Sequence, residues 1–591
     1  MNAVFHAIKW SLKYDFINCV SSLEVLCQRA IKLLPAGMDT TLSLDLTSSN
    51  CSLAPPDARF NIAACYSRTV GCSFFPKLPI ELCEKYCGSS FGHYNLLDVI
   101  GALTTWVIPL FGLMANMHFA QSTLHGLGTD WPWMSGILKN LSPKHFVFSV
   151  QLANPIGTIW SLADKLDLGQ QLWNHCERIK NNDLDRIANA RRDIANVCNC
   201  LDDFGYEKFE ERVNRLIALV TTETIKLDGE QVSVALLVCN HVKVASRDLA
   251  FARIRDTLHA TFAILVYVGN AVASLLTSIP SSGLESLDYA LPHTIALREL
   301  CFFLLAQVIL SSAAGRWAQQ WRPQVIMSIF AKEILDIENA IAKSRGQDIR
   351  PDIRSLWKDL AKEEIALWDG GSYVFRPQKS PFRKVITHSE DEFSRRNGRR
   401  WFLLVMACLM VVVAFSVSFT ISSLTPTKGI GGRSLAEILY ITVWTVNFLA
   451  EELWMVRQID RRERLFMLIW LKDGIISLLA LLFFFLPFIG EPFPSTVIWS
   501  AAAPFTNPRS GWYNSCRSWS AWFSRGNNAY LDLNVATTES WLDLRLYFSG
   551  IVAGSLAQIL LALVIVFMSR KVYALSHRSS EENESELCQK T

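Results

Sequence analysis

The amino-acid sequence predicts an all-α polytopic transmembrane helix bundle of about seven spans, with a small Cys-rich N-terminal ectodomain and helical cytoplasmic loops. Half of its 591 residues are hydrophobic, 19% are charged and the mean hydropathy is +0.22. Soluble domains usually carry about 25% charged residues. Here the apolar residues are concentrated in windows of about 20, the length that crosses about 30 Å of hydrocarbon. A soluble domain, a disordered chain and a small disulfide knot are therefore excluded.

Seven charge-poor windows are expected to cross the bilayer. Trp401–Leu424 and Phe548–Met568 lack charged residues and are the strongest. Leu291–Ala314 is the weakest, because Arg298 and Glu299 interrupt it, and a buried helix of a soluble kind is the alternative. The full set is Val99–His118, Leu258–Ile279, Leu291–Ala314, Trp401–Leu424, Ala436–Val456, Leu465–Ile489 and Phe548–Met568.

The positions of Lys and Arg predict that the N-terminus is outside and the C-terminus is cytoplasmic. Cytoplasmic loops retain positive charge, and the short loop 457–464 holds four arginines, whereas 281–290 holds no Lys or Arg. The expected location is the plasma membrane or an endomembrane. The regions between spans are then a Cys-rich extracytoplasmic region (1–98), two helical cytoplasmic regions (119–257 and the basic 315–400), an aromatic-rich extracytoplasmic loop (490–547) and a disordered cytoplasmic tail (569–591).

The two cytoplasmic regions place apolar residues at helical spacing against charged faces. They are interpreted either as a docking surface for a protein partner or as a cap on the bundle. Between the first two spans, Phe146–Trp160 is apolar but short and contains an Asn154-Pro155 break, which favours a re-entrant or interfacial helix over an eighth span.

The N-terminal 98 residues contain seven cysteines, a density that predicts a disulfide-stapled ectodomain. Asn50 begins an N-glycosylation sequon in this region. Residues 1–35 lack a clear signal peptide, so either the first span translocates them, the orientation is inverted, or the first exon is wrongly assigned. Cys516 makes the number of extracytoplasmic cysteines even. It either bridges to the N-terminal region or stays a free thiol, or else processing removes Cys19 or Cys27. The disulfide candidates are Cys19, Cys27, Cys51, Cys65, Cys72, Cys83, Cys87 and Cys516.

Charged residues within predicted spans are the main functional candidates, because burying them is costly unless they are paired. Four of them lie about 8–14 Å from the cytoplasmic loop 457–464 at 1.5 Å per residue, namely Glu451, Glu452, Lys472 and Asp473. We predict an ion pair between Glu452 and Lys472. It would serve either as part of a transport path or as a structural pair near the interface.

Arg298 and Glu299 approach from the opposite end of the bundle. In the last span, Gly550 and Gly554 permit close helix packing, either within the chain or in a dimer.

Motifs for nucleotide binding, serine hydrolysis, zinc proteolysis and calcium binding are not present in the sequence. We therefore predict no catalytic, metal or cofactor-binding residues, and the net charge of +3 gives no indication of nucleic-acid binding. The expected partner is the lipid bilayer, with a protein partner at the cytoplasmic helices and an unknown ligand.

Two stretches, ANPIGTIWSLADKL (153–166) and LTPTKGIGGRSLAEILY (424–440), resemble segments of a broad group of filamentous-fungal multi-spanning membrane proteins without assigned activity. The resemblance implies a fungal membrane protein and adds no catalytic residue. Three functions follow in order of preference. They are a non-enzymatic receptor-like or scaffold component, a transporter of a small molecule or ion that uses the intramembrane charges, and a membrane-embedded enzyme.

Overall fold

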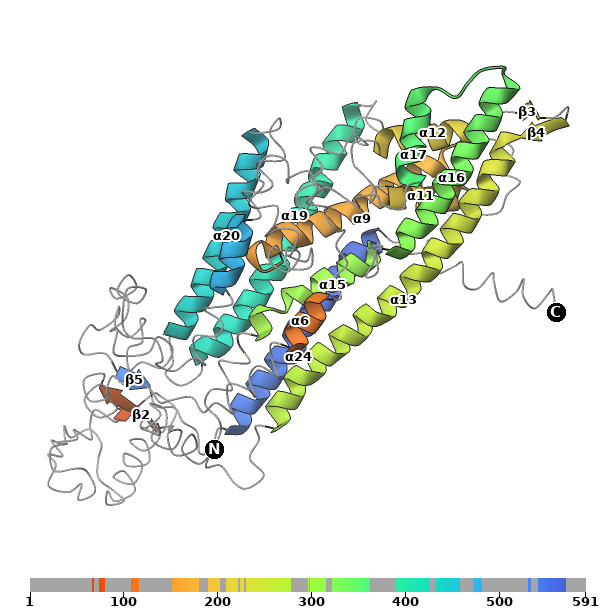
Figure 1. Cartoon of the computed structure of the whole chain (residues 1–591). Coiled ribbons are helices and arrows are strands. Elements are labelled where there is room, and N and C mark those ends of the chain that lie inside the picture. The colour runs from red at the N-terminus through yellow and green to blue at the C-terminus, as the bar shows by residue number, and fades with distance from the viewer. Residues whose placement is uncertain are drawn as a thin grey trace, which may run out of the picture.

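The described part of the chain is almost entirely helical in the computed structural model, which confirms the all-α prediction at this level (Figure 1). Its helices pack around two separate hydrophobic cores. We refer to the two units as the apolar bundle and the charged bundle. The structure describes residues 66–68, 74–79, 108–115, 151–179, 190–201, 209–221, 224–227, 230–277, 296, 298–314, 321–361, 390–424, 432–457, 471–480, 530–532 and 540–569.

The apolar bundle carries hydrophobic side chains on its outside as well as in its core. Its central helix, α15, is buried on nearly every side. Around it, surface positions such as Phe262, Val446 and Phe567 are 59–69% exposed. The unit contains α6 (Ile108–Ala115), α15 (Phe303–Ala313), α19 (Glu390–Leu424), α20 (Gly432–Arg457), α24 (Ser540–Met568), the helical residues 471–480, and parts of α9 (Pro155–Glu177) and α13 (Val234–Thr277).

The charged bundle is built from amphipathic helices that bury one apolar face each. Its core includes Trp357, which is completely buried and packs edge-to-face on Phe330. Arg215 donates two hydrogen bonds of 2.5 Å to the buried carboxylate of Glu338 and ties α12 to α16. The unit contains α11 (Ala190–Leu201), α12 (Phe209–Thr221), α16 (Trp321–Ser344), α17 (Pro351–Ala361), the hairpin of β3 (Thr224–Leu227) and β4 (Glu230–Ser233), and the remaining parts of α9 and α13.

Two helices run through both units. The 44 residues of α13 reach about 66 Å at 1.5 Å per residue, and Figure 1 shows this helix as one long rod. Val238 in its first half lies in the core of the charged bundle, whereas Tyr267 in its second half lies in that of the apolar bundle. Residues 258–277 of the predicted span Leu258–Ile279 therefore belong to the second half of a continuous helix that begins at Val234.

The junction between the two bundles is held by charged groups. Arg399, at the start of the apolar stretch of α19, lies 2.6 Å from the buried carboxylate of Asp167 on α9. It also donates to the carbonyl of Met568 at the end of α24. Lys165, buried on α9, donates to the carbonyl of Asn199 on α11 at 3.4 Å. The charged side chains of Arg399 and Asp167 therefore lie where the apolar stretch of α19 begins and that of α24 ends.

Two helices in the described residues are long and apolar enough to cross a membrane, Trp401–Ser423 and Tyr547–Met568. They coincide with the two strongest predicted spans. Within α13, Leu258–Ala273 is a shorter apolar stretch. In the region of the predicted span 291–314, a tight turn at residues 301–302 precedes α15. The count of seven spans stays a prediction.

A small sheet joins two distant parts of the sequence. β2 (Phe74–Pro79) pairs antiparallel with β1 (Tyr66–Arg68) on one side and with β5 (Tyr530–Asp532) on the other. It thereby connects the predicted N-terminal extracytoplasmic region with the predicted aromatic-rich extracytoplasmic loop.

Candidate functional site

The candidate site begins at a break in the helix that opens α9. Residues 151–153 are helical, Asn154 is not, and α9 begins at Pro155. Proline suits the first helical position because its missing N–H would have no partner there. Asn154 caps the helix, since its side-chain oxygen accepts a hydrogen bond from the Gly157 amide at 2.8 Å. The Thr158 hydroxyl donates to the Asn154 carbonyl at 2.9 Å.

The backbone carbonyls before the break are satisfied by side chains of α20. The indole N–H of Trp444 donates to the carbonyl of Leu152 at 2.7 Å, and the amide of Asn447 donates to that of Ala153 at 2.9 Å. Carbonyls at a helix end lack intrahelical partners, and such a break is tolerated in an apolar bundle only when other groups replace them. The helix break and α20 therefore form one polar unit.

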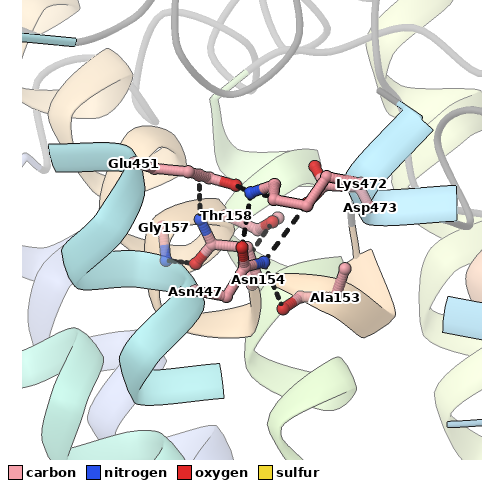
Figure 2. Close-up of polar contacts among 8 residues, drawn as sticks. All are labelled: Ala153, Asn154, Gly157, Thr158, Asn447, Glu451, Lys472 and Asp473. Atoms are coloured by element: carbon pink, nitrogen blue, oxygen red, sulfur yellow. Dashed lines mark hydrogen bonds and ion pairs between the residues drawn. The ribbon is translucent and has the colours of Figure 1, made fainter. Parts of the chain in front are cut away.

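Three charged groups gather on this unit (Figure 2). The ammonium of Lys472 contacts Glu451 Oε1 and Asn447 Oδ1, and it lies 3.2 Å from Asp473 Oδ1. Both carboxylate side chains are buried, with 1% exposure or less, whereas 28% of Lys472 is exposed. We call these residues, together with Asn154, the charged cluster.

Hydrogen bonds connect every member of the charged cluster to the helix break. The amide of Asn154 donates to Glu451 Oε2, and that of Asn447 donates to Asp473 Oδ1 at 3.2 Å. The partly positive N-terminus of α9 also favours a carboxylate beside it. Because two carboxylates face one ammonium, the ionised cluster carries one net negative charge.

The structure adds a partner that the sequence does not predict. The sequence predicts Glu452 as the partner of Lys472, and the structure shows Glu451, one residue earlier on α20, in contact with it. The side chain of Glu452 lies outside the described part, so its own pairing with Lys472 stays a prediction. Neighbouring residues on a helix point about 100° apart, so the depth of a charge alone does not decide which of the two faces the bundle.

The spacing along α20 is a signal that would have identified Glu451. Polar and aromatic side chains recur every three or four residues and face the interior, with Asn447 4% exposed and Leu439, on the opposite face, 40% exposed. The three- or four-residue spacing therefore predicts that Glu451 is the acidic residue on the inward face of α20. The inward stripe consists of Glu437, Tyr440, Trp444, Asn447 and Glu451.

The remaining predicted membrane charges lie near the other end of α20. Glu299 is completely buried and faces α24 at Gly550, where an added Cβ would lie 2.9 Å from Glu299 Oε1. Arg298 donates to the carbonyl of Asn270 on α13 at 3.1 Å. At Gly554 an added Cβ would lie 3.1 Å from the ring of Phe302. Both glycines therefore permit close packing within the chain.

The predicted ectodomain residues cannot be placed in the same way. The disulfide candidates and the glycosylation candidate all lie outside the described residues, and these are Cys19, Cys27, Cys51, Cys65, Cys72, Cys83, Cys87, Cys516 and Asn50.

Comparison with known proteins adds no relative. No protein-family model, curated protein or solved structure matches this chain. Its function is therefore argued from the geometry of the charged cluster.

Proposed function

We propose that the protein is an integral membrane transporter of a small cationic solute or ion, and that the charged cluster is its binding site. The observation that carries this proposal is the charged cluster itself, whose two carboxylates are buried beside a broken helix in a bundle with an apolar exterior. Broken helices with freed carbonyls and half-helix N-termini form the ion and substrate sites of many transporters. Ionisable residues inside a membrane bundle likewise mark substrate or ion paths.

The distribution of polarity supports placement of the apolar bundle in the bilayer. Side chains such as Leu258, Val405 and Leu560 are 59–65% exposed on its surface. Gln307, Glu299 and Glu451, by contrast, are buried with at most 1% exposure. A soluble protein shows the reverse arrangement, whereas lipid favours it.

Two further observations support the proposed orientation. Helices from both predicted cytoplasmic regions, 119–257 and 315–400, pack into the one charged bundle. The pairing of β2 with β5 joins the two predicted extracytoplasmic regions. In this arrangement the charged bundle lies in the cytoplasm and the N-terminus outside.

Lys472 gives the site a way to alternate between two states. Its ammonium occupies the position between the carboxylates of Glu451 and Asp473, so a cation binds only when it displaces this group. Lys472 is also the most exposed of the three charges and lies on the short helical segment 471–480. Release of Lys472 would break its contacts with Glu451 and Asn447 on α20, whereas the hydrogen bonds from Asn447 to Asp473 and from Tyr440 to the carbonyl of Ala480 would still hold the segment to that helix.

The test is charge movement in proteoliposomes on a solid-supported membrane. The probes are Na⁺, K⁺, ammonium and choline, each applied as a concentration jump. The wild type is expected to give a transient current with at least one of these cations. Glu451→Gln removes one of the two carboxylates that a displacing cation would contact, so it should abolish the current at equal amounts of folded protein. Glu333→Gln, which changes a 47% exposed carboxylate on α16, should not. Absence of current with every probe, or an equal current from Glu451→Gln, would contradict the proposal.

A receptor-like or scaffold role is the second candidate, with a protein partner at the charged bundle. It is favoured by exposed apolar side chains on this unit, where Phe251 of α13 is 74% exposed and Ile329 of α16 is 54% exposed. Ile329→Asp should then reduce the mass of the native complex on a blue native gel and leave the cation currents intact. An unchanged complex mass would remove the support for this role.

A further inference from the structure

A second buried acidic site lies about half of the length of α20 away from the charged cluster. Glu299 is completely buried, and neither of its carboxylate oxygens has a hydrogen-bond partner among the described residues. The side chain of Ile421 on α19 and the backbone of α24 at Gly550 close over it. The buried carboxyl group of Glu437 on α20 lies on the same side, because it accepts a hydrogen bond from Ser422, the residue that follows Ile421. It is thereby placed to interact with Glu299 electrostatically.

Three donors of this region, on Arg298, Tyr267 and Ser422, are directed to other acceptors. Arg298 directs its guanidinium to the carbonyl of Asn270 at 3.1 Å. On α13, the hydroxyl of Tyr267 donates to the carbonyl of Arg298 at 3.3 Å. On α19, Ser422 donates its hydroxyl to Glu437 Oε1. The thiol of Cys301, two residues further along the chain, is buried in the same region.

An ionised carboxylate in such surroundings is strongly unfavourable, because the side chain is shielded from bulk solvent and none of the described residues donates a hydrogen bond to it. A second carboxylate nearby makes simultaneous ionisation of both more unfavourable still. A protonated carboxyl group carries no charge and avoids both penalties.

We propose that Glu299 and Glu437 form a proton-binding pair that holds a proton on Glu299 at neutral pH. On release, the O–H bond of the carboxyl group breaks, the proton passes to water and the electron pair stays on the carboxylate. The site therefore takes up and releases a proton without any other cofactor.

The pair and the charged cluster are connected through the fold. Glu437 and Glu451 belong to the same inward stripe of α20, and the 14 residues between them correspond to about 21 Å. Gln307, two helical turns beyond Glu299, donates to the carbonyl of Pro155 at the helix break at 3.5 Å. The inference deepens and rests on the proposed transport function, because it makes the proton the ion coupled to cation movement.

Infrared difference spectroscopy of the purified full chain in lipid tests proton binding without a transport assay. At neutral pH, exposed carboxylates are ionised, so a carbonyl stretching band of a protonated carboxyl group reports a buried acid. The wild type should show this band, and it should move on transfer to D₂O. Glu299→Gln should remove the band and Glu299→Asp should shift it. Glu333→Gln, which changes a 47% exposed carboxylate on α16, should leave it unaltered.

The outcomes separate the two proposals. Absence of the band in the wild type, or its persistence unaltered in both Glu299 variants, overturns the proton site even if cation currents are observed. A band that behaves as expected supports the proton site even if no cation produces a current, and only the transport proposal then fails. Glu299→Gln is isosteric with the protonated acid and should retain the thermal stability of the wild type. If this variant does not fold, the shift in Glu299→Asp decides.

Discussion

Replacing Lys472 with methionine tests whether the charged cluster holds the helix break against α20. The substitution keeps an unbranched side chain but removes the ammonium that contacts Glu451 and lies 3.2 Å from Asp473. Removing one partner of a buried ion pair costs about 3–5 kcal/mol, because the other charge stays buried alone. Since 28% of Lys472 is exposed, water screens part of this effect. We expect a loss of about 3 kcal/mol in the free energy of unfolding.

A double-mutant cycle separates this pair from general damage. Glu451→Gln keeps the hydrogen-bonding shape and should cost about 1–2 kcal/mol. With Lys472→Met in the same chain, neither charge of this pair is left alone, so the loss should be at least about 1 kcal/mol smaller than the sum of the single losses. Glu452→Gln is the matched control on the same helix turn, and its effect should simply add to that of Lys472→Met.

The assay is equilibrium unfolding by denaturant in detergent micelles, followed by tryptophan fluorescence. Losses from Glu451→Gln and Lys472→Met that add within about 0.5 kcal/mol would refute the pairing. A rescue by Glu452→Gln instead would show that the neighbouring carboxylate is the partner.

Three further predictions concern other parts of the fold. Gly550→Ala should destabilise the protein by about 1–3 kcal/mol through overpacking, because the added Cβ would lie 2.9 Å from neighbouring side chains. Gly269→Ala, whose added Cβ would have nothing within 4 Å, should stabilise the protein by about 0.5–1 kcal/mol. Thermal unfolding of the two variants compares these effects. Burial, and to a smaller extent the nearby Arg178, lower the pKa of His175 in the folded protein. Neutral His175 therefore contributes its full stability above the unfolded-state pKa of about 6.5. This contribution is lost as the pH falls below that value, because the unfolded state binds the proton more readily. His175→Gln should therefore flatten the loss of the unfolding midpoint between about pH 7 and 5, and an unchanged slope would contradict this. A hydrogen bond with Cys176, followed by burial, raises the pKa of Cys198, so iodoacetamide should label Cys198 only after unfolding; labelling of Cys198 in the native protein, detected by mass spectrometry, would show that this thiol is not buried against Cys176.

The sequence predicts the two strongest spans well, because an uninterrupted apolar window is visible in the sequence and also forms one continuous apolar helix in the structure. Trp401–Leu424 and Phe548–Met568 agree with the helices Trp401–Ser423 and Tyr547–Met568 to within one residue at each end. The start of α13 is not predicted, since hydropathy changes near residue 258 while the helix continues from Val234. Helical backbone hydrogen bonds do not depend on whether the side chains face water or lipid.

The candidate site is predicted only in part. The equal distance from the cytoplasmic loop 457–464 predicts that Lys472 lies at the level of Glu451 and Glu452 on α20. Which of these two faces Lys472 depends on the direction in which each side chain points around the helix axis. Asn154 is predicted as a break and not as a partner of Glu451, because the contact joins residues 297 positions apart. Glu437 is missed for a similar reason, since its proximity to Glu299 arises from tertiary packing and not from any local motif.

Electron cryomicroscopy of the chain in lipid nanodiscs tests the central claim most directly, because it images the lipid disc and the helices together. The account predicts that the disc encloses the exposed apolar surfaces of α19, α20, α24 and the second half of α13. The Glu451–Lys472 pair and the break at Asn154 should lie within the disc, while α16 and α17 project from it. A disc that leaves the charged cluster outside the lipid, or that surrounds α16 and α17, would contradict the account.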